Sequence, residues 1–373
     1  MGYLKYFIFN YGFLVAFLLV AILLIVIGIK AKKSVIKHIM FNTSAIFLAI
    51  CLYEGYLLMT VEKKAFSYFE GSFTHTPEYW NGNGVRWFGP ANEEFVISVR
   101  KIYDFNHELY DVQYTVKDGI RNTPGSVDTS KSFALFLGCS FTFGEGLEDN
   151  QTVPYYFNSY SGNKYLVRNY GFHGYGPHHA LFITENEILK DTALINGKSE
   201  SVVFYSLLPD HYGRAAGYKN WDKYGPKYVI EGDSLVFKGK FHEKYGKFKE
   251  NLYKVWEGTQ LFKRHFSHKE TKEEDVLRVV MMLARIRDDF MKVGVPFYVV
   301  LDYDSCNGKY SEYLISLLDK YKLSYFKVSD MIPDISPNSS KYFMENDGHP
   351  VALYNEQIGK YLAEKISNLK LKK

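Results

Sequence analysis

The feature that most constrains this chain is an apolar segment close to its N-terminus. Residues from Tyr6 to Ile29 include no charged side chain and are mostly Leu, Ile, Val, Phe and Ala. A helix needs about 20 such residues to cross the hydrocarbon core of a bilayer. A cleaved signal peptide would have a shorter apolar region, about 7–15 residues, ending in a small-residue cleavage site. Lys30, Lys32 and Lys33 follow instead, so we predict a transmembrane helix.

A second apolar stretch, Ile39 to Val61, is interrupted by Asn42 and Glu54. Glu54 stands near the far end of the stretch, where a carboxylate could lie at the membrane interface. We expect this stretch to be a second span. Residues 1–61 then form a membrane anchor with two transmembrane helices.

The lysines between the two stretches predict the orientation of the anchor. Lys30, Lys32, Lys33 and Lys37 lie between them, whereas only Lys5 precedes the first. Short loops rich in Lys or Arg stay in the cytoplasm. With two spans, the rest of the chain lies on the non-cytoplasmic, periplasmic or extracellular side of the cell (inner) membrane. If the second stretch does not span, this orientation reverses.

Composition excludes some partners. With 45 basic and 41 acidic residues the net charge is only +4, and the lysines are spread along the chain, so nothing indicates a nucleic-acid partner. Cys51, Cys139 and Cys306 show neither a CxxC nor a Cys/His metal spacing. We therefore expect no structural metal and no disulfide framework. A bridge between Cys139 and Cys306 stays open, because both follow strand candidates.

Residues 62–130 contain short aromatic and β-branched runs broken by turn residues. Tyr110 to Val116, followed by Asp118-Gly119, is a hairpin-like signal. This pattern predicts a β-rich lead-in segment rather than a separate catalytic unit. The alternative is a linker whose strands pack on the main domain.

After Ser130 short apolar strands alternate with amphipathic helices, which predicts an α/β three-layer sandwich with a mainly parallel sheet. The strand candidates are Phe133 to Leu137, Val202 to Leu208 and Pro296 to Leu301. Thr271 and Glu274 form a capping box before a long helix, and Pro350 favours the start of the last helix. Residues 215–262 interrupt the alternation and are predicted to be an insertion, partly a β-hairpin around Gly232.

The first chemical candidate is Ser140. The strand from Phe133 ends abruptly in Gly138-Cys139-Ser140, and more glycines follow. In an α/β sheet ligands bind at the carboxyl ends of the strands, so Ser140 would project into a site. The alternative is that Ser140 is an ordinary helix cap.

The second candidate is Asp347-Gly348-His349-Pro350, just before the last helix. Serine becomes a good nucleophile when an adjacent base takes its proton, and a carboxylate that orients the base fixes its tautomer. Alone, an Asp-x-His loop is more often incidental. Its weight comes from occurring together with Ser140.

These two segments resemble the first and last blocks of the SGNH/GDSL hydrolase superfamily, over about Lys131 to Leu369. The resemblance implies a flavodoxin-like SGNH fold, with Ser140 as nucleophile and with Asp347 and His349 completing a triad. The first block is usually Gly-Asp-Ser, so Cys139 replaces an aspartate that is not the nucleophile.

The resemblance also implies an oxyanion hole made by the backbone N–H groups of Ser140 and Gly171. Gly171 lies in Asn169-Tyr-Gly-Phe-His-Gly-Tyr-Gly, which is similar to the second block. The third block usually supplies an asparagine, whereas Leu207-Leu-Pro-Asp-His stands here. Asp210 or His211 would take its place, and a protonated His211 could donate a hydrogen bond that an ionised Asp210 could not.

Other polar residues have plainer interpretations. His173, His178 and His179 are expected to be solvated loop residues rather than metal ligands. Arg214 is a further cationic candidate, but surface solvation is its expected role. Gly232-Asp233-Ser234 spells the family triplet, but strand-like runs flank it, so a turn is expected.

The predicted function is serine-dependent acyl-ester hydrolysis or O-acyl (acetyl) transfer through an acyl-Ser140 intermediate, without a cofactor. An acylated small molecule or a cell-surface carbohydrate polymer would be the substrate. The alternative is a non-catalytic, glycan-binding or assembly-scaffold member, because the third-block asparagine is missing.

Overall fold

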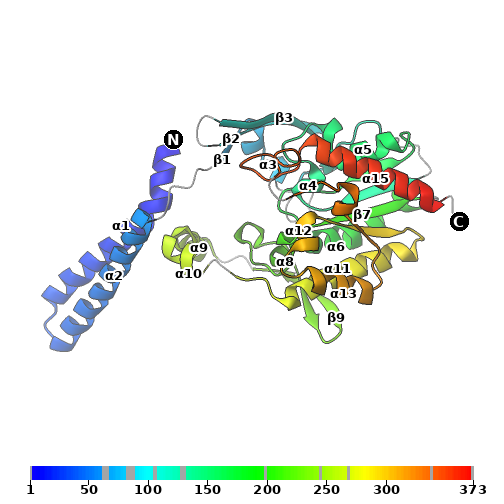
Figure 1. Cartoon of the computed structure of the whole chain (residues 1–373). Coiled ribbons are helices and arrows are strands. Elements are labelled where there is room, and N and C mark those ends of the chain that lie inside the picture. Colours follow the sequence, from blue (N-terminus) through cyan, green and yellow to red (C-terminus); the bar gives the residue numbers. More distant parts are fainter. Residues whose placement is uncertain are drawn as a thin grey trace. The chain divides into compact units, whose positions relative to one another are not determined.

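A computed structural model describes residues 2–60, 67–80, 89–103, 107–126, 132–196, 200–242, 246–266, 269–336 and 339–370. The chain divides into two compact units (Figure 1). The first contains Met1–Lys64 and Glu243–Glu270, and the second contains Ala65–His242 and Thr271–Lys373. The chain therefore passes between the units three times.

The first unit is built on two long apolar helices, α1 (Gly2–Lys30) and α2 (Ser34–Thr60). They pack on each other, and the Ser44 hydroxyl donates to the Ala21 carbonyl at 3.0 Å. By length and composition both are able to cross a membrane. Two short helices, α9 (Lys247–Gly258) and α10 (Gln260–His265), pack against them.

The second unit contains a nine-stranded sheet within the described residues, in the order β1-β2-β3-β4-β6-β5-β7-β10-β11. Its strands are β1 Ser67–Glu70, β2 Phe95–Tyr103, β3 His107–Lys117, β4 Ile120–Arg121, β5 Phe133–Leu137, β6 Leu166–Asn169, β7 Val202–Leu207, β10 Phe297–Leu301 and β11 Tyr325–Lys327. The last five strands in the sheet order are parallel. In chain order they run 2-1-3-4-5, the order of flavodoxin-like folds. The predicted α/β class with a mainly parallel sheet is confirmed.

The strands that precede β5 extend this sheet at the β6 edge. β1, β2, β3 and β4 pair in antiparallel order, and Arg121 of β4 pairs with Asn169 of β6. β3 turns into β4 at Asp118 and Gly119, both of which have positive φ. Segments before residue 130 are thereby brought beside the parallel strands.

The predicted strand at Phe133–Leu137 has the observed bounds. Every residue in it is buried, because the sheet is covered on both faces. Phe133, Leu135 and Leu137 belong to one hydrophobic cluster, and Ala134 and Phe136 belong to the other.

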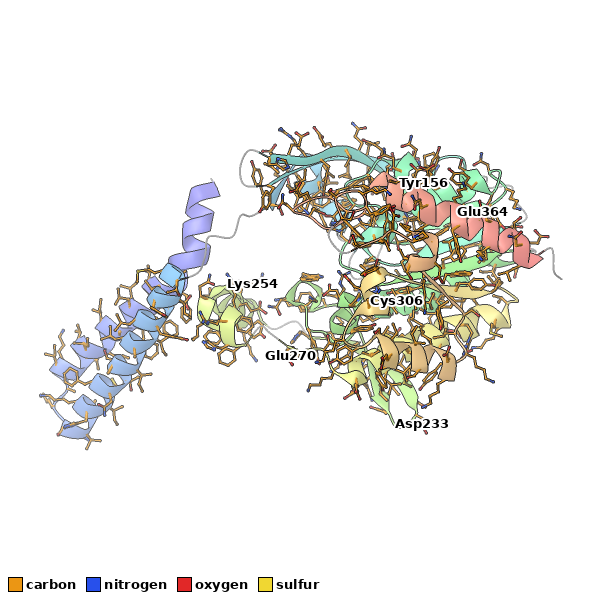
Figure 2. All side chains as sticks on the ribbon, viewed as in Figure 1. Tyr156, Asp233, Lys254, Glu270, Cys306 and Glu364 are labelled. Carbon is orange, nitrogen blue, oxygen red and sulfur yellow. The ribbon has the colours of Figure 1, made fainter. Side chains whose placement is uncertain are left out.

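Helices cover the two faces (Figure 1). The cluster on one face includes side chains of α6, α8, α11 and α13, and that on the other includes side chains of α5, α14 and α15. Tyr156 and Glu364 mark α5 and α15 in Figure 2. The helices of this unit are α3 Pro77–Trp80, α4 Ser140–Phe143, α5 Val153–Tyr160, α6 Pro177–Asn186, α7 Thr192–Ile195, α8 Asp210–Ala215, α11 Glu273–Lys292, α12 Tyr303–Asn307, α13 Ser311–Lys320, α14 Val328–Met331 and α15 Ala352–Lys370.

Two helix starts differ from the sequence prediction. α11 begins at Glu273, and the Asp275 carboxylate accepts the Lys272 N–H at 2.9 Å. The predicted capping box from Thr271 to Glu274 is therefore wrong by one residue. α15 begins at Ala352, because Pro350 bridges to Phe343 instead of opening the helix.

The stretch predicted as an insertion contains the separate hairpin of β8 (Pro226–Glu231) and β9 (Ser234–Lys240). Gly232 has a φ of +60°, and Asp233 marks the turn in Figure 2. The Gly-Asp-Ser triplet there is a hairpin turn. In the main sheet, β5 lies between β6 and β7, where the strand order reverses, so a ligand site is expected at the carboxyl ends of β5 and β7.

Candidate active site

Ser140 is the first residue of α4, three residues after β5 ends. Gly138 makes this abrupt change possible, because its φ is +157° and a Cβ there would lie 2.1 Å from Thr142 Oγ1. Gly144 ends α4 with a φ of +84°. A side chain at either glycine would displace the turn that presents Ser140.

His349 lies beside Ser140 although 209 residues separate them in the chain. Its Nε2 is 2.8 Å from Ser140 Oγ, and its Nδ1 forms a very short hydrogen bond with Asp347 Oδ1. Asp347 Oδ1 also accepts the backbone N–H of His349 at 3.1 Å. The three residues predicted as a triad therefore lie together, with the serine and the carboxylate on opposite ring nitrogens.

A second carboxylate faces the same imidazole. Glu145 Oε2 lies 3.4 Å from His349 Nε2, and Glu145 Oε1 accepts the Tyr110 hydroxyl at 3.2 Å. Lys101, on β2, pairs with Asp347 at very short range and lies 3.5 Å from Glu145. Sequence reasoning missed both residues. Glu145 lies in the glycine-rich motif after Ser140, and its place there could have indicated a role in the site. No sequence motif marks Lys101.

His173 continues this network away from the serine. Its Nδ1 lies 2.6 Å from Glu145 Oε2, and its Nε2 lies 2.7 Å from the Tyr79 hydroxyl. The side chain is buried, so the prediction that His173 is solvated is wrong. A continuous series of polar groups runs from Tyr79 through His173, Glu145 and His349 to Ser140.

The charges in this network shift one another's pKa. Burial opposes the charged form of His349, but Glu145 and Asp347 outweigh it and raise the pKa of His349. Burial would raise the pKa of Glu145, yet His349, His173 and Lys101 hold it well below its usual range. Burial lowers the pKa of His173, and Glu145 offsets this only in part.

Arg121 fixes the loop that follows Ser140. Its guanidinium is fully buried and donates to the carbonyls of Phe143 at 3.0 Å, Gly144 at 2.7 Å and Leu147 at 2.5 Å. It also pairs with Asp149 at 3.1 Å. Carbonyls at the end of a short helix need donors, and a planar guanidinium can serve several at once.

Gly171 packs directly against α4. A Cβ there would lie 2.5 Å from the Phe143 nitrogen and 2.9 Å from the Cys139 oxygen, so only glycine fits. Its N–H donates to Asn169 Oδ1 at 3.0 Å, and Asn169 Nδ2 donates to the Thr142 carbonyl at 2.9 Å. The predicted oxyanion role therefore requires the Gly171 N–H to be shared with a ligand.

The two third-block candidates differ in their surroundings. Asp210 pairs with Arg214 at 2.7 Å and with Lys219 at 2.6 Å. Burial would raise the pKa of Asp210, but these cations lower it, so the group is an ionised acceptor. Arg214 also donates to the Tyr175 carbonyl at 2.8 Å and is largely buried, so surface solvation does not describe it.

His211 is completely buried, with its Nδ1 2.9 Å from the Tyr205 hydroxyl and accepting the Leu208 N–H at 3.3 Å. Burial and the nearby Arg214 put the pKa of His211 well below its ordinary value. His211 is therefore neutral at physiological pH. Because Nδ1 accepts the Leu208 N–H, the proton of the neutral ring is on Nε2, and the third-block role of Asp210 or His211 stays a prediction.

A cavity of about 710 Å³ opens next to these residues. Phe141, Asp210, Tyr303, Met344 and Asp347 are among its lining residues. It combines aromatic faces with carboxylate acceptors, and it has the size of a small-molecule site.

Two groups of described side chains could geometrically share a cation: His178, His179 and Asp222, and Glu145, Asp347 and His349. In the first group both imidazoles approach the Asp222 carboxylate, at 2.6 Å and 3.2 Å. The two histidines are buried, which corrects the prediction that they are solvated. In the second group the Lys101 ammonium already contacts both carboxylates.

Cys51, Cys139 and Cys306 are free thiols, so no Cys139–Cys306 bridge forms.

No protein-family model and no curated protein matches the chain. Among solved structures, a carbohydrate acetylesterase from Sinorhizobium meliloti is 13% identical, with a TM-score of 0.32 over 64% of this chain and 99% of that chain. An acetyl xylan esterase from the rumen bacterium Butyrivibrio proteoclasticus is 12% identical, with a TM-score of 0.34 over 72% and 69%. AlinE4, an SGNH-hydrolase family esterase, is 15% identical, with a TM-score of 0.33 over 66% and 98%. At these values the likeness carries no argument about activity.

Proposed function

We propose that the chain is a membrane-anchored serine acyl-hydrolase or O-acyltransferase. The observation that carries the proposal is the hydrogen-bonded series from Ser140 Oγ through the His349 ring to Asp347, at the carboxyl edge of a parallel sheet. A serine beside a base that a carboxylate orients is the arrangement required for acyl transfer.

The proposed reaction has two halves. Ser140 Oγ attacks the ester carbonyl carbon as its proton passes to His349 Nε2. His349 then returns that proton to the departing alcohol oxygen as the C–O bond breaks, which leaves an acyl-Ser140 ester. Water or a sugar hydroxyl next attacks this ester and gives its proton to His349, and the proton finally returns to Ser140 Oγ.

The negative oxygen of each tetrahedral intermediate needs donors. We assign the backbone N–H of Ser140, at the start of α4, and the N–H of Gly171 when Asn169 releases it. The ionised Asp210 is an acceptor and is not assigned to this role.

For the substrate we propose an O-acylated carbohydrate at the cell surface. The aromatic and carboxylate groups lining the cavity, such as Tyr303 and Asp210, suit stacking on sugar rings and hydrogen bonding to hydroxyls. We further propose that α1 and α2 span the cell membrane with the lysines between them in the cytoplasm, which puts the second unit on the outer side.

One observation favours a non-catalytic glycan-binding protein as the second candidate. The third-block position offers the acceptor Asp210, and the Gly171 N–H already has Asn169 as its partner. A site with these groups would bind a sugar without stabilising an oxyanion.

The deciding experiment uses the full chain in detergent with a fluorophosphonate probe and p-nitrophenyl acetate. We expect labelling and acetate release in the parent protein and neither in Ser140→Ala. Ser234→Ala, in the hairpin turn that also reads Gly-Asp-Ser, is the matched control and should behave as the parent. A folded parent protein that shows neither reaction would overturn the catalytic proposal in favour of glycan binding.

A further inference from the structure

Glu54 is an acidic residue inside the candidate span α2, and its side chain is almost completely buried. Its two carboxylate oxygens accept the backbone N–H groups of Gln260 at 2.7 Å and Leu261 at 2.8 Å. Acidic residues within a span are costly unless they are paired. Here the start of α10 supplies the hydrogen-bond donors that the buried carboxylate needs. The segment Glu243–Glu270, which contains α9 and α10, is called the insertion below.

Aromatic contacts hold α9 and α10 to the same end of the helix pair. The Trp256 ring lies 6.0 Å from Phe13 on α1 and 5.6 Å from Phe266 after α10. The Tyr53 hydroxyl, on α2, lies 2.8 Å from His265 Nε2. The docking thus joins both long helices to the insertion.

The position of Glu54 along α2 predicts the depth of this contact. Twenty residues separate Ser34 from Glu54, which corresponds to about 30 Å of helix. A bilayer hydrocarbon core is also about 30 Å thick. If the lysines that precede α2 mark one boundary, Glu54 and the start of α10 lie at the other.

The outer surface of this insertion is amphipathic. Leu252 and Val255 of α9 and Phe266 after α10 are 54%, 46% and 56% exposed. By helical periodicity Leu252 and Val255 share a face of α9 with Trp256, and Lys254, which Figure 2 labels, falls on the opposite face. Helices with one apolar face and one charged face bind in the plane of a membrane interface.

We propose that α9, α10 and the following Phe266, residues 247–266, form an interfacial membrane element. Leu252, Val255 and Phe266 would enter the boundary between headgroups and acyl chains of the bilayer that α1 and α2 span. The proposal rests on the proposed membrane anchor. Lipid is the proposed occupant because α9 packs on α1, a candidate span whose Leu19 and Leu23 are also exposed.

In this proposal the insertion adds a second attachment of the second unit to the membrane, beside the link after α2. The chain leaves the second unit after His242, reaches the membrane surface and re-enters that unit at Thr271. The second unit is then attached to the membrane at more than one point.

The test uses the full chain in vesicles of phosphatidylethanolamine and phosphatidylglycerol. After replacement of the three native cysteines by alanine, nitroxide spin labels are attached at single cysteines introduced at Leu252, Val255, Phe266 or Lys254. Collision with oxygen, which concentrates in lipid, is compared with collision with a water-soluble nickel complex. A label at Leu19 provides the reference for the anchor.

We expect oxygen collisions to dominate at positions 252, 255 and 266, and nickel collisions to dominate at 254. Nickel access at 252, 255 and 266, with position 19 in lipid, would overturn this proposal and leave the anchor intact. Labels at 252 and 255 shielded from both reagents would also overturn it, because protein would then cover the face. Nickel access at position 19 would instead overturn the proposed anchor.

Discussion

Glu145 Oε2 lies 3.4 Å from His349 Nε2, the same nitrogen that lies 2.8 Å from Ser140 Oγ. The imidazole is therefore between two carboxylates, with Asp347 at Nδ1 and Glu145 at Nε2. Both favour the protonated ring, whereas a general base must be neutral before it accepts a proton. In the proposed mechanism, the balance between Glu145 and Lys101 would therefore set the pH range in which Ser140 reacts.

Glu145→Gln is expected to move the acidic limb of the pH–activity profile to lower pH. In the parent protein Glu145 and Asp347 raise the pKa of His349, so the proposed esterase activity is expected to rise with pH over a range higher than an ordinary histidine would give. Removing the Glu145 charge destabilises the imidazolium and lowers this pKa. The measurement is kcat/KM for p-nitrophenyl acetate against pH. Glu108→Gln, at an exposed ion pair on β3, is the control, and an unchanged limb in Glu145→Gln would contradict the expected role.

Lys101→Met is expected to move the same limb in the opposite direction. Lys101 lowers the pKa of His349 and neutralises Asp347 and Glu145. Without it both carboxylates act on His349 unopposed, so the imidazole stays protonated to higher pH. The pH profile is compared with that of Lys117→Met, which removes an exposed lysine of β3. A limb at lower pH in Lys101→Met would show that its ion pairs do not govern His349.

Arg121→Met is expected to reduce the free energy of unfolding by about 3–5 kcal/mol, the usual loss when one member of a buried charged network is removed. The carbonyls of Phe143, Gly144 and Leu147 would lose their donor together. Chemical denaturation of the full chain in detergent measures the loss. Arg100→Met removes two exposed ion pairs, with Glu70 and Glu108, and should cost much less than Arg121→Met. Equal losses in the two variants would rule out a special role for Arg121.

Asp302→Asn is expected to change how stability depends on pH. Burial raises the pKa of Asp302 to about 6, despite the hydrogen bond from Tyr354. Between its unfolded value, about 4, and this folded value, the folded state binds more protons than the unfolded state. Stability therefore falls as pH rises through that interval. Asn cannot ionise, so relative to the parent the variant should gain about 2–3 kcal/mol between pH 4 and pH 7. A difference that stays constant across this range would disprove the shift.

The sequence predicted the parts of the structure that are encoded locally. Phe133–Leu137 is a continuous apolar run because both sheet faces are covered, and Ser140 and His349 stand in short motifs next to predicted elements. Lys101 escaped prediction because its partner Asp347 is 246 residues away and the contact exists only after β2 joins the sheet. The complete burial of His211 could not be predicted for a related reason, since burial depends on all the segments packed around a side chain.

The partners of Glu54 could not be predicted either, because they are distant in the sequence. In the sequence it only interrupts an apolar stretch, and its partners Gln260 and Leu261 lie more than 200 residues later. No local pattern connects a carboxylate in α2 with the start of a short helix in an insertion. The hydrogen bonds from Gln260 and Leu261 to Glu54 can be recognised only in the folded structure.

The chain crosses between its two units three times, and this affects how proteolysis could release the second unit from cells. A protease that cuts only between residues 61 and 66 leaves that unit covalently joined to residues 243–270. Residues 243–270 still contact the severed helix pair, because Gln260 and Leu261 bind Glu54, Trp256 contacts Phe13 and His265 binds Tyr53. If the proposed anchor spans the membrane, release into the medium requires further cuts on both sides of residues 243–270, and a single cut leaves the second unit attached.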